Sequence, residues 1–151
     1  MTLHVAEIAW SRGDAAFLDH GYSRAHVWRF DGGAEVPASS APTSVAPPLS
    51  DPTAVDPEEA LAAAVGSCHM LFFLALAAKA GFVVDAYADR PEALLERDNR
   101  GRMSVTRIIL RPQIVWIGEP PGAETLAGLH EQAHRLCYIA NSLRGEVVVE
   151  G

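Results

Sequence analysis

Residues 60–78 contain no Asp, Glu, Lys or Arg, and no other part of the chain is so continuously apolar. The segment approaches the length of a membrane-spanning helix. Ser67, Cys68 and His69 at its centre are unfavourable in a hydrocarbon environment. A helix that is apolar on every face also occurs as the buried centre of a globular protein. We therefore expect a buried core helix and no membrane partner.

The residues around this segment predict where the helix begins and ends. Asp56 is a favourable N-cap, Pro57 suits the first helical position, and Glu59 has capping-box spacing from Asp56. The helix is expected to end near residues 79–80, with Gly81 in the left-handed conformation that closes many helices.

The rest of the chain predicts strands and one further helix. Residues 37–55 hold five prolines and are expected to form an irregular connection. Pro112 implies an edge or a bulge in the longest strand pattern. Residues 91–97 are ambiguous, with a helical turn as the interpretation considered. Apolar residues at helical spacing predict a second helix over 123–138. Strands are expected at 3–10, 21–30, 34–36, 82–87, 103–117 and 144–150.

These elements predict an α+β protein with a mostly antiparallel sheet, a long buried central helix and a second helix. We expect one domain, 1–151, made of N-terminal strands (1–36), a Pro-rich connection (37–55) and a helix–sheet–helix core (56–151). A single small sheet cannot cover a helix that is apolar all round. The pattern therefore predicts a homodimer that buries this helix between subunits.

Composition narrows the compartment and the partners. The net charge of −7 and the absence of a basic run argue against nucleic acid and anionic membranes. Two cysteines are too few for a secreted disulfide scaffold, and the N-terminus lacks the pattern of a signal peptide. We expect a cytoplasmic protein, in whose reducing environment paired cysteines are more often reactive than structural.

The two cysteines are Cys68, in the apolar segment, and Cys137, near the second helix. Either could be a small buried hydrophobic residue. A reactive thiol would instead need a nearby positive charge or a helix N-terminus. Cys68 lies roughly 16 Å along the helix from its start, so the dipole of its own helix helps little. An arginine must then come from elsewhere in the fold.

Arg24 and Arg29, on the strand expected at 21–30, are the preferred arginines, and Arg12 and Arg144 are weaker alternatives. Glu58 could orient such an arginine. It lies ten residues before Cys68, about 15 Å on a straight helix. One arginine can contact both only if its side chain bridges them, the helix bends, or Glu58 belongs to a partner subunit.

Two separated motifs resemble those of the OsmC/Ohr organic hydroperoxide reductases. The first is Pro57-Glu58-Glu59 followed by Cys68, eleven positions after the proline; the second is Cys137, then Asn141, then Arg144-Gly145. His69 departs from the pattern, because the family's peroxidases have an apolar or aromatic residue there. With the long Pro-rich connection, this departure indicates a divergent branch.

The resemblance implies an intertwined homodimer that reduces organic hydroperoxides without a cofactor. Cys68 would attack the peroxide and become a sulfenic acid, and Cys137 would resolve it as a disulfide. A dithiol of the lipoyl type would then reduce the disulfide. Glu58 matches the family's carboxylate, and Arg24 matches its strand arginine.

Two alternatives remain open. His130-Glu131-Gln132-Ala133-His134 has the H-E-x-x-H spacing of zinc sites. The extended zinc motif needs glycine at 137 and histidine at 140, where this chain has Cys137 and Ala140. His69 or Cys137 could supply a third ligand, and no metal is the preferred expectation. The second alternative is a non-enzymatic dimer that binds an apolar small molecule, with both thiols inert.

Overall fold

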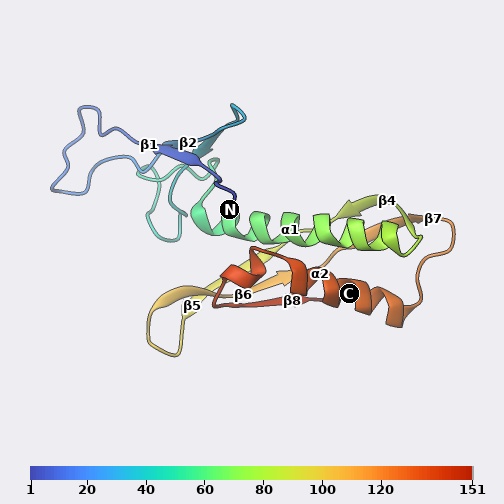
Figure 1. Ribbon diagram of the computed structural model, residues 1–151. Helices are drawn as coiled ribbons and strands as arrows, with labels where there is room; N and C mark the ends of the chain where they lie inside the picture. Colours follow the sequence, from blue (N-terminus) through green and yellow to red (C-terminus); the bar gives the residue numbers. More distant parts are fainter. Residues whose placement is uncertain (151) are drawn as a thin grey trace. The chain divides into compact units, whose positions relative to one another are not determined.

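The computed structural model describes residues 1–150, and the chain forms two compact units, Met1–Ala60 and the remainder from Leu61. In the first, β1 (Ala6–Ala9), β2 (His26–Phe30) and β3 (Glu35–Ala38) form an antiparallel sheet in the order β1-β2-β3 (Figure 1). The strands predicted at 3–10 and 21–30 therefore exist, and both are shorter than predicted.

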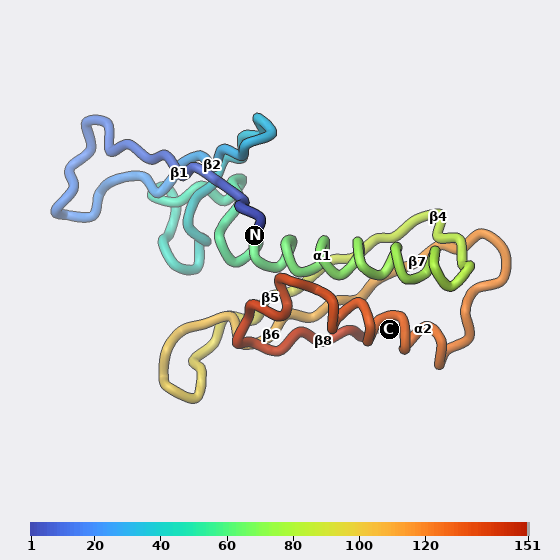
Figure 2. The backbone as a smooth tube through the Cα atoms, in the orientation of Figure 1, coloured from blue at the N-terminus to red at the C-terminus, as the bar shows by residue number. Residues whose placement is uncertain are grey.

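Aromatic packing explains why residues 21–25 are not part of β2. Phe17 stacks on Tyr22 with ring centroids 4.8 Å apart, and Trp10 meets the edge of Tyr22 at 5.3 Å. The Trp10 indole donates to the carbonyl of Ser23 at 2.8 Å. Figure 2 follows the resulting excursion of the chain between β1 and β2. The expectation that Arg24 lies on a strand is wrong, because these contacts fold its segment into a loop.

Residues 39–54 contain neither helix nor strand, as predicted for the Pro-rich connection. The segment still returns to β3, where Ala38 and Val55 form an isolated parallel bridge. The Ser39 N–H donates to the carbonyl of Val55, and the Val55 N–H donates to that of Pro37, each at 3.0 Å. The connection is thereby held at its end by backbone hydrogen bonds.

Helix α1 (Pro57–Lys79) has the ends that the sequence predicted. The Glu59 N–H donates to Asp56 Oδ1 at 2.8 Å, and the Asp56 N–H donates to Glu59 Oε2 at 3.2 Å, which completes the capping box. Gly81 adopts φ +85°. The Phe82 N–H reaches the carbonyl of Ala77 at 3.0 Å, as in a Schellman closure.

The second unit contains the remaining strands: β4 (Val83–Ala88), β5 (Glu92–Arg97), β6 (Met103–Leu110), β7 (Gln113–Ile117) and β8 (Glu146–Val149). The pairs β4–β7 and β5–β6 are antiparallel, and β6–β8 is parallel. The helical turn considered for 91–97 is wrong, because these residues pair with β6. The strand pattern over 103–117 is split at 111–112, where Pro112 has no N–H to donate.

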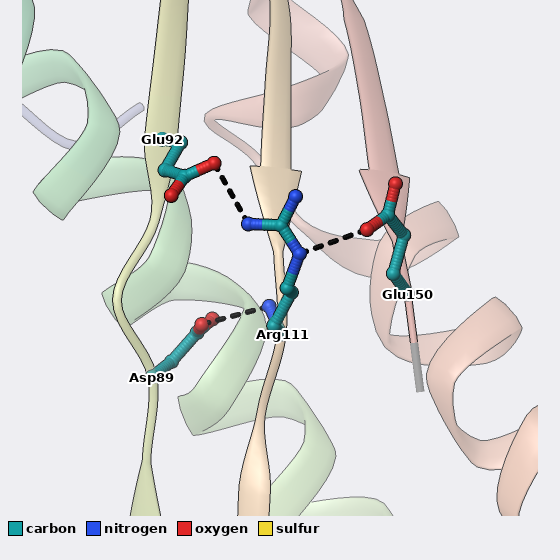
Figure 3. A network of polar contacts seen from close by, with 4 residues as sticks. All are labelled: Asp89, Glu92, Arg111 and Glu150. Atoms are coloured by element: carbon teal, nitrogen blue, oxygen red, sulfur yellow. Dashed lines mark hydrogen bonds and ion pairs between the residues drawn. The ribbon is translucent and has the colours of Figure 1, made fainter.

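Arg111 lies at this break and joins three segments of the sheet (Figure 3). Its backbone N–H donates to Asp89 Oδ1 at 2.8 Å. Its guanidinium donates to Glu92 at 2.7 Å and to Glu150 at 2.8 Å. These ion pairs are exposed, so each contributes at most about 1 kcal/mol. Their geometric effect is to hold the end of β8 beside β6.

Helix α2 (Ala123–Leu136) lies beside α1 and runs antiparallel to it (Figure 1). Phe73 and Ala77 of α1 form a buried core with Leu129 and Ala133 of α2. The second helix ends two residues before the predicted 138, and a 3₁₀ turn follows at Ala140–Ser142. With two helices and mostly antiparallel sheets, the α+β prediction is confirmed.

The prediction that α1 is buried on all sides is not met within one chain. Its outward face includes Ala64, Ser67, Leu71 and Ala75, and Leu71 is 61% exposed. Within residues 1–150, α1 alone is long and apolar enough to cross a membrane. That is weak support for a membrane span, because core helices have the same length and composition.

Candidate active site

The structure brings the two cysteines together, although 69 positions separate them in the sequence. Cys68 lies on the fourth turn of α1 and is partly exposed, whereas Cys137 is fully buried. Both are free thiols. Cys137 is also the residue that caps α2, with its N–H on the carbonyl of Ala133 at 2.9 Å. Its position is therefore set by the end of the helix.

The two thiols have different environments. The pKa of Cys137 is raised to about 11, mainly by burial and also by the neighbouring Cys68. The Ala140 N–H, 3.4 Å from Cys137 Sγ, acts in the opposite direction. The Cys137 thiol is thus held in its protonated form next to Cys68.

Arg24 lies in the first unit, in the loop before β2. Its guanidinium donates to the carbonyls of His20, at 2.7 Å, and of Tyr22, and stands 4.1 Å from the centroid of the Tyr22 ring. Its own N–H donates to the carbonyl of Leu49 at 2.7 Å. No carboxylate pairs with Arg24 among residues 1–150. These contacts define a loop conformation that leaves its charge without a counterion.

Arg29, the other preferred arginine, forms ion pairs with two carboxylates. It lies on β2 opposite Glu7 of β1 and Glu35 of β3. Its guanidinium contacts Glu7 at 2.9 Å and Glu35 at 2.5 Å. Hydrogen bonds with Glu35 and then Glu7 raise the pKa of Arg29. Between two carboxylates, Arg29 is a poor choice for activating a thiol.

Glu58 lies in the first turn of α1 and is partly exposed. Within residues 1–150 its carboxylate has no hydrogen bond or ion pair. Because α1 is continuous from Pro57 to Lys79, the ten residues to Cys68 still correspond to about 15 Å. Glu58 and Arg24 belong to the first unit, so a role for either at the thiols stays a prediction.

Three histidines gather between α1 and α2, and sequence reasoning found them only in part. The rings of His69 and His130 lie edge to edge in nearly parallel planes, 7° apart, with Nε2 of His69 3.0 Å from Nδ1 of His130. His69 is 1% exposed. Burial lowers the pKa of His69 to about 4, and the charges of His130 and His134 act in the same direction. Only the H-E-x-x-H spacing could have drawn attention to this cluster.

The cluster brings His69 next to His130, as the metal alternative required. The facing nitrogens are used in a hydrogen bond, however. Among residues 1–150 there is no group of three or more His, Cys, Asp or Glu side chains that could hold a metal ion. The geometry therefore favours a buried imidazole pair over a zinc centre.

Comparison with known proteins agrees with the two cysteine motifs. The model of the family described as OsmC-like protein matches residues 50–150. A search of the curated proteins finds no match. Among solved structures, an OsmC-like protein of unknown function from Vibrio cholerae O1 biovar eltor is 47% identical, covers 99% of each chain and has a TM-score of 0.96.

More distant structures share the fold. An organic hydroperoxide resistance protein OsmC from Legionella pneumophila is 15% identical, with 100% of this chain and 98% of that chain covered and a TM-score of 0.70. One from Elizabethkingia anophelis is 16% identical, with 99% and 98% covered and a TM-score of 0.70. The family match includes both cysteines. The chain belongs to the OsmC-like protein family.

Proposed function

We propose that this protein is a cysteine-based peroxidase that reduces organic hydroperoxides. The observation that carries the proposal is the pairing of a partly exposed Cys68 with a buried Cys137 whose pKa is raised to about 11. The thiol that reacts with the peroxide must be accessible to the substrate. The thiol that resolves the sulfenic acid must lie close to it. The family includes organic hydroperoxide resistance proteins, which supports the same activity.

The proposed reaction has three steps. The Cys68 thiolate attacks the O–O bond of ROOH, forming Cys68–SOH and, after protonation, the alcohol ROH. Cys137 then attacks the sulfenic sulfur, forms the Cys68–Cys137 disulfide and releases water. A dithiol of the lipoyl type reduces the disulfide by exchange and leaves as its own disulfide. Each turnover consumes two reducing electrons, which the dithiol supplies. We propose that the reaction takes place in the cytoplasm, whose reducing environment keeps dithiols available.

Arg24 is proposed to supply the positive charge that activates Cys68. It lines a hollow of about 440 Å³ in the first unit, together with the aromatic residues Trp10, Phe17 and Tyr22. An aromatic wall next to a cation suits a peroxide that carries an organic group, since the rings accept apolar substituents and the arginine favours the thiolate and leaving oxyanion. Glu58 is proposed to orient this arginine.

A homodimer is part of the proposal. The apolar outward face of α1, centred on Leu71, needs a cover that one chain does not provide. A second copy of α1 would bury it. A partner subunit would also relieve the distance of about 15 Å between Glu58 and Cys68, because Glu58 could then come from the other chain.

The test is dithiol-dependent reduction of cumene hydroperoxide and of hydrogen peroxide by wild type and Cys68→Ser. Turnover that is faster with the organic peroxide and absent in the variant supports the proposal. No turnover with either peroxide would overturn it and favour the ligand-binding alternative. Activity that a chelator abolishes would move attention to His130 and His134.

A further inference from the structure

A second pocket lies entirely within the second unit. It measures about 600 Å³, within the range of small-molecule sites. One face of α2 and the strands β7 and β8 line it, and the walls are mostly apolar, with Ile114, Trp116, Leu126 and Val147 among them. Neither cysteine lines this pocket. The proposed peroxidase reaction therefore leaves it without a role.

Two imidazoles and the carboxylate of Glu131 supply the polar groups of the pocket. His130 and His134, one helical turn apart on α2, both line it. Nδ1 of His130 is bonded to His69, and Nδ1 of His134 is buried without a partner. The Nε2 atoms of His130 and His134 also have no hydrogen-bond partner among residues 1–150, so each ring has a nitrogen left for a ligand.

The charges around the pocket disfavour both anionic and cationic ligands. Burial lowers the pKa of His130, so its ring is neutral near pH 7. Glu131 is the only charged residue in the lining, and the chain carries a net charge of −7. A carboxylate or phosphate would meet negative charge and no cation there. A cation would have to lose its water against an apolar wall.

The hydrogen bond between His69 and His130 limits which functional group of a ligand can bond to Nε2 of His130. If His130 Nδ1 carries the proton, its Nε2 accepts; if His69 carries it, Nε2 of His130 donates. A hydroxyl group can both donate and accept, so it matches His130 in either tautomer. We propose that this pocket binds an uncharged, largely apolar small molecule with one hydroxyl group, held by His130 and His134.

Calorimetry with 4-phenyl-1-butanol tests the proposal, with 4-phenylbutyrate and n-butylbenzene as comparators. We expect saturable one-to-one binding of the alcohol and weaker binding of both comparators. Ala127→Trp should fill the pocket and abolish binding, whereas Gln132→Trp, on the exposed side of α2, should not. His134→Phe should weaken alcohol binding about fivefold, the effect of one net hydrogen bond, and leave butylbenzene unchanged.

Each other outcome counts against the site. Carboxylate binding as tight as alcohol binding would overturn the neutral-ligand assignment. Absence of alcohol binding by wild type, or unchanged binding by Ala127→Trp, would overturn the pocket itself. Cys68→Ser should bind the alcohol as wild type does; loss of binding in that variant would place the ligand at the thiols instead. These binding measurements test the pocket alone, whereas the peroxidase assays test the reaction at the thiols, so either proposal can fail without the other.

Discussion

The imidazoles of His69 and His130 meet edge to edge between α1 and α2, with 3.0 Å between Nε2 and Nδ1. A hydrogen bond between two imidazole nitrogens needs one of them unprotonated. His134 and Asp89 are the other titratable groups that act on this pair. The hydrogen bond joins α1, which contains Cys68, to α2, which ends at Cys137. Protonation of both imidazoles would break this link between the two helices.

Stability should fall on acidification because of His69. Its pKa drops from 6.5 in the unfolded chain to about 4 when folded, so the unfolded state binds more protons between these values. The contribution is complete above pH 6.5 and is lost as the pH falls toward 4. We expect a loss of about 1–2 kcal/mol between pH 7.5 and 5 from this residue.

Urea unfolding at several pH values measures this effect. His69→Gln should be less stable than wild type at pH 7.5 and should lose less stability on acidification. His4→Gln, at an exposed position, should retain the wild-type slope. Equal slopes in wild type and His69→Gln would contradict the assignment.

Alkylation should distinguish the two thiols. At pH 8 only about one Cys137 thiol in a thousand would be ionised, given a pKa of about 11. Iodoacetamide should therefore modify native wild type at one site, Cys68, and native Cys68→Ser at none within the same time. Mass spectrometry reports both. Modification of Cys137 as fast as Cys68 would show that its burial does not protect it.

Cys137→Ser should permit one oxidation and then stall. The Cys68 sulfenic acid would form and persist, because no second thiol resolves it. Dimedone trapping should detect one adduct per chain, and steady-state turnover with dihydrolipoamide should vanish. Sustained turnover by this variant would remove Cys137 from the proposed mechanism and leave the external dithiol as the resolving group.

The two arginines of the first unit should differ in function. Arg24→Ala should reduce peroxidase activity by on the order of tenfold or more, since one charge-assisted contact is worth about 1.5–3 kcal/mol. Arg29→Ala should retain activity and lose at most about 1 kcal/mol of stability, because its side chain is 43% exposed between Glu7 and Glu35. Equal activity of the two variants would contradict the role proposed for Arg24.

Two glycines form a matched pair for packing. A Cβ at Gly145 would lie 2.5 Å from the carbonyl oxygen of Val105 and 3.0 Å from that of Thr106, on the backbone of β6, which cannot yield cheaply. Gly145→Ala should destabilise by about 1–3 kcal/mol. Gly128→Ala in α2, with nothing within 4 Å, should stabilise by up to about 1 kcal/mol. Thermal unfolding of both variants measures the contrast.

Leu71 should be central to the proposed dimer. Leu71→Glu places a charge on the apolar outward face of α1 and should give a monomer by size-exclusion chromatography with light scattering. Met103→Glu, also exposed but on β6, should keep the wild-type mass. A monomeric wild type would contradict the homodimer directly.

The sequence by itself determined the ends of α1, the α+β class and the family. Capping is decided within a few residues: Asp56 and Glu59 bond to each other's N–H, and Gly81 takes a conformation that favours glycine. Periodicity identified α2 but ended it two residues too late, since fraying and capping at a helix end depend on the turn that follows. Residues 91–97 were ambiguous because their strand pairing with β6 is a tertiary contact.

Only the tertiary structure decided which side chains meet. Cys68 and Cys137, and His69 and His130, lie more than 60 positions apart, and no local pattern specifies that α1 and α2 pack with these faces together. Gly66 illustrates the same limit: its Cβ would meet the ring of Pro91 at 2.5 Å, a packing constraint that the sequence could not reveal. Helix caps and turns depend on a few neighbouring residues and can be predicted from the sequence. The neighbours of a side chain depend on how whole helices and strands pack.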